Sequence, residues 1–214
     1  MLIKNVGKIV PFRTATSIGQ KLPDDWQEKI EKFKLYLNKI KDGIDLVNIG
    51  NMDEVPVCFD MPGTHTVDEK GSQYVRITTT GHEKMCFTVV LCVTAKGSKC
   101  TPMVIFKRKT MPKDKFPCGI IVKVNERGWM NAEVFKEWIK EVWNNRKGRF
   151  FKKSDSVLIY DSTRSHLTEE VKAVVNKDAR IAVIPGGMTK LLQPLDISVN
   201  KSFKSRIRLN WECG

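Results

Sequence analysis

The stretch from Val157 to Phe203 decides how the rest of the chain is interpreted. It opens with the apolar run VLIY at 157–160, which leads into Asp161, and continues with a second apolar run, IAVI at 181–184, which leads into PGG. Short apolar runs bounded by polar and turn residues predict buried strands. Ligands of open α/β sheets gather beyond the carboxyl ends of such strands, so Asp161 stands where chemistry is expected.

A second carboxylate follows in the segment LLQPLD at 191–196. Pro194 favours the first position of a helix, which places Asp196 in the first turn, where the positive end of the helix dipole suits an anion. Beyond it, apolar residues recur every four positions, as one face of a helix requires: Val199, Phe203, Ile207 and Trp211. For either aspartate taken alone, a structural role as a loop cap or a dipole partner is the simpler interpretation.

A third candidate, Asp53, lies in the segment LVNIGNMDE at 46–54. Two-metal phosphoryl transfer requires several carboxylates that converge on hard cations. Magnesium prefers oxygen ligands and keeps several waters, so Asp53, Asp161 and Asp196 would suffice to hold it. Their separations are 161 − 53 = 108 and 196 − 161 = 35 residues, and spacing by itself does not choose between a metal site and three structural aspartates.

Three motifs, NMDE at 51–54, YDSTRSH at 160–166 and GGMTKLLQPLD at 186–196, together resemble the DDE-superfamily transposases of the pogo, Tigger and jerky group, which includes centromere protein B-like transposase-derived proteins. The likeness covers about residues 44–212 and is specific only when the motifs are combined. It implies an α/β, RNase H-like (retroviral-integrase-like) fold, a mixed sheet flanked by helices, with a metal-dependent DNA cutting and joining reaction. Carried over by position, the catalytic and metal-binding residues are Asp53, Asp161 and Asp196, with Mg²⁺ or Mn²⁺ as the cofactor. The segment STR at 162–164 departs from the Asp-Asn pairing common in related transposases.

The same resemblance implies a division of the chain into two parts. Residues 44–212 would form the DDE (here DDD) endonuclease domain. Residues 1–43 would be a basic linker and connector helix that follows a missing or truncated helix-turn-helix region. For the connector, apolar residues at helical spacing predict an amphipathic helix: Trp26, Ile30, Phe33, Leu37 and Ile40. The resemblance also implies DNA as the partner and a nuclear location, and it leaves a homodimer open.

Composition supports a polyanionic partner. The 214 residues are 41% hydrophobic and 29% charged, with a formal net charge of +13, which indicates a globular protein that attracts nucleic acid. The basic residues predicted to contact nucleic acid are Lys107, Arg108, Lys109, Arg146, Lys147, Arg149, Lys201 and Lys204.

The six cysteines include no Cys-x-x-Cys pair, and there are three histidines. This pattern argues against a zinc site and favours separate thiols in a reducing compartment. No apolar run approaches the length of a membrane span, so no membrane partner is expected.

Strands are predicted at 44–52, 74–79, 85–94, 102–106 and 120–124, with a loop over 55–72 and helices that begin near residues 131 and 168. The alternative function is that of a domesticated, catalytically silent protein that keeps the fold and binds DNA or other proteins. An unrelated α/β hydrolase has no support, because neither a Gly-x-Ser-x-Gly elbow nor a Gly-rich phosphate loop is present.

Overall fold

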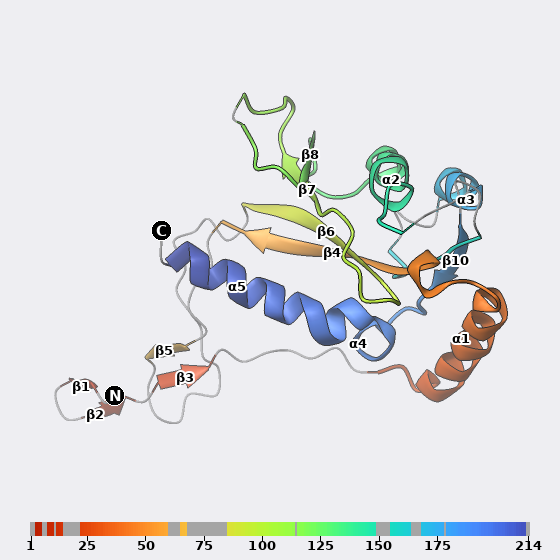
Figure 1. The fold of residues 1–214 in the computed structure, drawn as a ribbon. Coiled ribbons are helices and arrows are strands. Elements are labelled where there is room, and N and C mark those ends of the chain that lie inside the picture. Colours follow the sequence, from red (N-terminus) through yellow and green to blue (C-terminus); the bar gives the residue numbers. More distant parts are fainter. Residues whose placement is uncertain are drawn as a thin grey trace. The chain divides into compact units, whose positions relative to one another are not determined.

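The computed structural model describes residues 3–5, 8–10, 12–14, 22–59, 65–67, 85–113, 115–148, 155–163, 168–177 and 179–212. The chain divides into two units. One comprises residues 1–21 and 58–85, and the other comprises residues 22–57 and 86–214. The second unit carries all three candidate aspartates. Its principal sheet is drawn in Figure 1.

The first unit contains short paired strands in its described residues. β1 (Ile3–Asn5) pairs antiparallel with β2 (Lys8–Val10), and β3 (Phe12–Thr14) pairs antiparallel with β5 (His65–Val67). β5 falls inside the stretch that was expected to be a loop. The strand expected at 74–79 lies outside the described residues.

The second unit is built on a six-stranded sheet with the order β10-β9-β4-β6-β7-β8. β9 pairs in parallel with both β4 and β10, β7 pairs in parallel with β8, and β6 pairs antiparallel with β7. The expected mixed sheet is therefore confirmed. The strands are β4 (Ile49–Cys58), β6 (Cys86–Thr94), β7 (Met103–Lys107), β8 (Ile121–Asn125), β9 (Val157–Tyr160) and β10 (Arg180–Val183).

The helices of this unit begin where capping residues allow. The side chain of Asn131 accepts a hydrogen bond from the N–H of Val134, and that of Thr168 accepts one from Val171, so orphan N–H groups in the first turns of α2 and α3 are satisfied. The elements are α1 (Trp26–Lys41), η1 (Leu46–Asn48), α2 (Ala132–Trp138), η2 (Ile139–Trp143), α3 (Glu169–Val175), α4 (Thr189–Leu192), η4 (Leu195–Val199) and α5 (Asn200–Glu212).

Helices cover both faces of the sheet, because successive strand residues point to opposite sides. One apolar cluster joins Met52 and Leu158 to the α2 and α3 side, where Trp138 and Trp143 are fully buried. The other joins Ile159 and its neighbours to Phe33 of α1. Figure 1 shows α2 and α3 on one side of the sheet, and α1 and α5 on the other.

β4 begins and ends later than the predicted strand at 44–52, and this changes the setting of Asp53. The strand continues to Cys58 because Val55 and Val57 keep the inward-facing alternation, with only 1% and 3% of their surface exposed. The described pairing of β4 with β9 ends at Asn51, five residues before Pro56, so the missing N–H of Pro56 interrupts no hydrogen bond of that pairing. Asp53 therefore lies within a strand rather than after one.

Two cysteines differ from the expected set of free thiols. Cys58, the last residue of β4, and Cys86, the first residue of β6, are disulfide-bonded, whereas Cys92, Cys100 and Cys118 are free. These residues are 28 positions apart in the sequence, but β4, which ends at Cys58, and β6, which begins at Cys86, are neighbours in the sheet. Among the described helices, none combines the length and the apolar character needed to cross a bilayer.

Candidate active site

Asp53 is a half-buried carboxylate on β4, and its environment disfavours the charged form. Burial, followed by the negative charge of Asp196, raises the pKa of Asp53 to about 7. Hydrogen bonds from Asn200 and from the N–H of Glu54 act in the opposite direction, and the charge of Asp161 makes a smaller contribution that raises the pKa further. Asp53 therefore lies within electrostatic reach of both other aspartates.

The register of the sheet explains the spacing of Asp53 and Asp161. β4 and β9 are parallel, and Asn51 lies beside Ile159, an offset of 108 positions. The two aspartates have the same offset, since 161 − 53 = 108. Extending the register by two residues brings both carboxylates to the same level and the same face of the sheet. β9 ends at Tyr160, so Asp161 stands just beyond its carboxyl end.

The carboxylate of Asp161 is engaged by its own loop. One oxygen accepts a hydrogen bond of 2.6 Å from the hydroxyl of Thr163, and the other accepts one of 3.3 Å from the Thr163 N–H. An aspartate that bonds to the backbone two residues later forms an Asx turn. Thr163, one of the residues that depart from the pattern of related transposases, therefore holds the orientation of this carboxylate.

Asp196 reaches the site because two buried amides tie its helix turn to β4. The side chain of Asn51 accepts a hydrogen bond of 3.1 Å from the Leu195 N–H, and the side chain of Gln193 donates one of 3.4 Å to the Met52 carbonyl. Asp196 lies in the first turn of η4, two residues after Pro194, as the sequence predicts. The first turn is where a negative charge is favoured by the helix dipole.

Asn200 joins two of the three aspartates directly. Its side-chain nitrogen donates a hydrogen bond of 2.5 Å to Asp53 and one of 2.9 Å to Asp196. The residue is 7% exposed, and its side-chain oxygen is buried with no hydrogen-bond partner among the described residues. The Asn200 amide thus lies between two carboxylates that would otherwise repel one another.

The donor set of this site fits a hard divalent cation. Carboxylate and amide oxygens are the ligands that magnesium accepts, and Asp53, Asp196 and the unpartnered oxygen of Asn200 supply them in one place. Within the described residues, however, no three acidic, histidine or cysteine side chains stand close enough to hold a metal ion together. The structure brings Asp53 and Asp196 together through Asn200, while Asp161 bonds to Thr163.

Comparisons with known proteins agree with this architecture. Residues 84–213 match the family model described as "DDE superfamily endonuclease". The chain belongs to this family. It is 34% identical to the human protein named "Pogo transposable element with KRAB domain", over 94% of this chain and 34% of that protein, and 25% identical to the human "Pogo transposable element with ZNF domain", over 92% of this chain and 14% of that protein. It is thus similar to pogo-derived proteins, and it spans about a third or less of the length of these relatives.

Solved structures show the same fold at low identity. The Mos1 mariner paired end complex with Mn matches with a TM-score of 0.58 and 13% identity, covering 90% of this chain and 53% of that one. The catalytic domain of Mos1 mariner transposase matches with a TM-score of 0.54 and 11% identity, covering 90% and 76%. The expected RNase H-like fold is confirmed.

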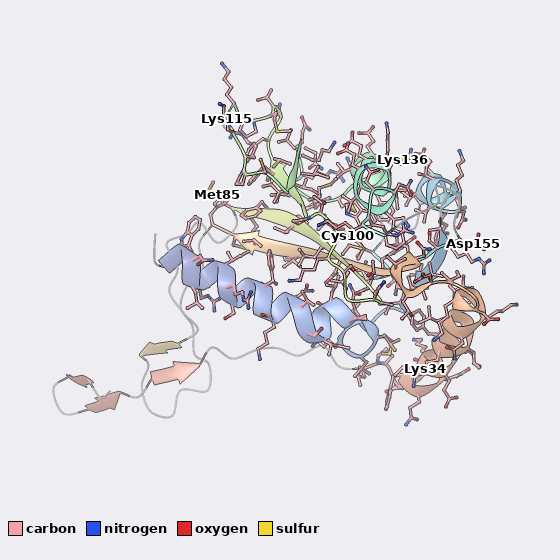
Figure 2. The ribbon with its side chains drawn as sticks, viewed as in Figure 1. Lys34, Met85, Cys100, Lys115, Lys136 and Asp155 are labelled. Carbon is pink, nitrogen blue, oxygen red and sulfur yellow. The ribbon has the colours of Figure 1, made fainter. Side chains whose placement is uncertain are left out.

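Most of the basic residues predicted to bind nucleic acid are exposed in this DDE-family domain. The first three lie at the end of β7 and the start of the loop to β8, and Figure 2 shows Lys115 of that loop projecting away from the sheet. Lys109 is 3.9 Å from Glu126, an exposed pair that contributes little to stability. Arg149 lies outside the described residues. The exposed members are Lys107, Arg108, Lys109, Lys147, Lys201 and Lys204.

The expectation that Arg146 contacts nucleic acid is wrong. Its guanidinium is buried, with 5% of the residue exposed, and donates hydrogen bonds to the carbonyls of Val47 and Trp143 and to the Asn48 side chain. It also stacks over the Trp143 ring at 3.8 Å. Arg146 therefore links the end of η2 to η1, and its guanidinium is largely withdrawn from solvent.

Sequence reasoning missed three amides that organise the site: Asn51, Gln193 and Asn200. Asn51 and Gln193 lie inside motifs that carry the family resemblance, which was the available signal, whereas Asn200 lies four residues beyond the last of these motifs. Asn51 is two strand residues before Asp53, so both point to the same face, and Asn200 is one helical turn after Asp196. Such spacings predict contact only when the partner aspartate is already known.

Proposed function

We propose that this chain is the catalytic domain of a transposase-derived, metal-dependent DNA endonuclease that also transfers strands. The observation that carries the proposal is the Asn200 amide shared by Asp53 and Asp196, together with the raised pKa of Asp53. Carboxylates crowded in this way are expected where a divalent cation normally balances their charge.

In this proposal Asp53, Asp161 and Asp196 hold Mg²⁺ or Mn²⁺. When bound, the cations activate a hydroxyl nucleophile and stabilise the leaving oxygen of a phosphodiester. The protein itself positions the acids. Asn51 fixes the end of β9 and the first turn of η4. The exposed basic residues bind the phosphate backbone without regard to base sequence. Solved Mos1 complexes named for their Mn, Mg or transposon end support metal and DNA as ligands.

The decisive experiment measures the effect of Mg²⁺ on thermal unfolding and on the nicking of supercoiled DNA. A cation present at a hundred times its dissociation constant stabilises a folded protein by about 2.7 kcal/mol. We expect the parent to gain stability with Mg²⁺ and to nick DNA, and the Asp161→Asn variant to lose both responses. Asp42→Asn, a change at an exposed aspartate after α1, serves as the matched control. A parent protein whose thermal unfolding and DNA nicking do not change with Mg²⁺ would contradict the proposal.

The second candidate is a domesticated protein that retains the fold and its DNA contacts without cutting. The names of the curated relatives favour it, because they join a pogo transposable element to a KRAB or ZNF domain. This candidate predicts salt-dependent DNA binding with no Mg²⁺-dependent nicking. Under either proposal DNA is the partner and the nucleus the expected location, and a homodimer is checked by sedimentation with and without DNA.

A further inference from the structure

We propose that Asn200 is a cation-responsive member of the metal site. Without metal, its amide nitrogen bridges Asp53 and Asp196. With metal, the amide turns by half a rotation and presents its oxygen to the cation. This inference rests on the proposed function, and it adds a fourth protein ligand to the three aspartates.

The bridging contact cannot coexist with a cation at the same place. The nitrogen of Asn200 directs its two hydrogens at one oxygen of Asp53 and one of Asp196, at 2.5 and 2.9 Å. These hydrogens carry partial positive charge, and the amide nitrogen has no lone pair to offer a metal. A cation shared by the two carboxylates would therefore displace or reorient the amide.

The oxygen of the same amide is ready to take that position. It is buried and has no hydrogen-bond partner among the described residues, which is an unfavourable state for a buried acceptor. The nitrogen and oxygen of an asparagine amide are nearly equal in size, so a half-turn exchanges them without displacing neighbouring atoms. The turn gives the oxygen a positive partner only when a cation is present.

The separations of the Asn200 amide from the two carboxylates suit adjacent positions in the octahedral coordination of magnesium. Ligand oxygens at about 2.1 Å from the ion lie about 3.0 Å apart on adjacent corners. After the half-turn, the Asn200 oxygen would take the present position of the nitrogen, 2.5 and 2.9 Å from the two carboxylate oxygens. A small relaxation away from Asp53 completes the match.

The backbone needs no movement for this exchange. Asn200 begins α5, directly after η4, and Asp196 lies one turn earlier in η4. Leu195 of that turn is held by Asn51 on β4. The aspartate-bearing turn and the strand are thus fixed to each other, and the rotation of one side chain is the remaining freedom.

The test follows the side-chain amide of Asn200 by NMR during a Mg²⁺ titration of the whole chain. Its ¹H–¹⁵N pair is assigned by its loss in the Asn200→Asp variant. We expect this pair to shift with the same midpoint as the gain in thermal stability. In parallel, Asn200→Ala should weaken Mg²⁺ binding by about ten-fold to a hundred-fold, the range typical of supporting groups at metal sites.

Asn200→Asp supplies the complementary result, because it places an oxygen at the site without the need for a turn. A third carboxylate beside Asp53 and Asp196 should lower the melting temperature without metal and enlarge the increase that Mg²⁺ produces. Asn210→Asp, an exposed position further along α5, is the control and should change neither quantity appreciably.

The outcomes separate this inference from the proposed function. If Mg²⁺ stabilises the parent and Asn200→Ala equally, and the Asn200 amide signals stay in place, Asn200 is a structural bridge only, and the inference fails while the proposed function stands. If Mg²⁺ has no effect on the parent, both fail. If Asn200→Ala does not fold, the NMR titration of the parent and the Mg²⁺ response of the Asn200→Asp variant still test whether Asn200 responds to the cation.

Discussion

Asn51 accepts a hydrogen bond of 3.1 Å from the backbone N–H of Leu195, although 144 positions separate the two residues. The same side chain donates a hydrogen bond of 3.1 Å to the carbonyl of Ile159. One buried amide on β4 therefore fixes the strand that leads to Asp161 and the turn that carries Asp196. Asp53 follows on the same face of β4, so the placement of all three acids depends on this residue.

Replacing Asn51 by Leu should destabilise the fold. The change leaves the Leu195 N–H and the Ile159 carbonyl buried without partners, which costs about 2–4 kcal/mol in the free energy of unfolding. Urea titration measures the loss. Asn145→Leu is the control, since Asn145 bonds to the Glu141 carbonyl on the exposed surface and its loss should cost less than about 1 kcal/mol. Equal effects of the two changes would contradict the role given to Asn51.

The stability of the metal-free protein should fall as the pH rises from about 4 to about 7. The pKa of Asp53 is raised from 3.8 to about 7 by burial and by Asp196. The folded state therefore keeps a proton that the unfolded chain releases across this window, so ionisation favours unfolding. Three pH units correspond to a loss on the order of 4 kcal/mol.

Asp53→Asn isolates this contribution, because it removes the titrating group and keeps its shape. With EDTA present, the variant should match the parent near pH 4 and exceed its free energy of unfolding near pH 7.5. Mg²⁺ should reverse the trend for the parent alone, because a cation favours the ionised carboxylate. Parallel pH profiles for the variant and the parent would show that Asp53 is not the group responsible.

The sequence predicted the strand and helix pattern because the apolar periodicity of the second unit is strong. It did not predict that Asp53 and Asp161 lie at the same level: their separation of 108 equals the register offset of two parallel strands. Strand pairing depends on residues that are distant in the sequence. The separation of 108 can therefore be interpreted as a register offset only once the sheet order is known.

Two features could not be predicted for other physical reasons. An asparagine that bridges carboxylates has no periodicity of its own, so Asn200 is indistinguishable from any polar helix residue. The run of basic residues at 146–149 looks uniformly exposed, yet Arg146 is buried because carbonyls and an amide at the end of η2 and in η1 satisfy its guanidinium. Burial of one arginine in a basic run depends on partners distant in sequence.

Substitution of Arg146 should therefore lower the stability of the fold, whereas substitution of its neighbour Lys147 should leave it nearly unchanged. Arg146→Ala leaves several buried acceptors unpaired and removes the stacking on Trp143, so we expect a loss of about 3 kcal/mol or more in the free energy of unfolding. Lys147→Ala, at an exposed position, should change stability by less than about 0.5 kcal/mol. Below the melting temperature of the Arg146 variant, its affinity for DNA should equal that of the parent. A selective loss of DNA binding without destabilisation would restore Arg146 as a nucleic-acid contact.

The exposed residues Lys107, Arg108 and Lys109 should contact the DNA backbone. Changing all three to Gln should weaken binding and reduce the slope of log K against log salt by up to about 2.7, because each phosphate contact contributes about 0.9. Fluorescence anisotropy across a salt series measures both quantities, and thermal unfolding should be nearly unchanged, since exposed charges contribute little to stability.

The control for this triple change removes the same amount of charge elsewhere. Lys34, Lys39 and Lys41 are exposed on α1, and Figure 2 shows Lys34 well separated from the loop that carries Lys115. Changing these three to Gln lowers the net charge equally, so it tests long-range attraction without removing a predicted contact. If residues 107–109 contact the DNA backbone, the triple change at 107–109 should reduce the affinity and the salt slope distinctly more than the triple change on α1. Equal losses would mean that net charge alone attracts the DNA, and that residues 107–109 form an ordinary solvated surface.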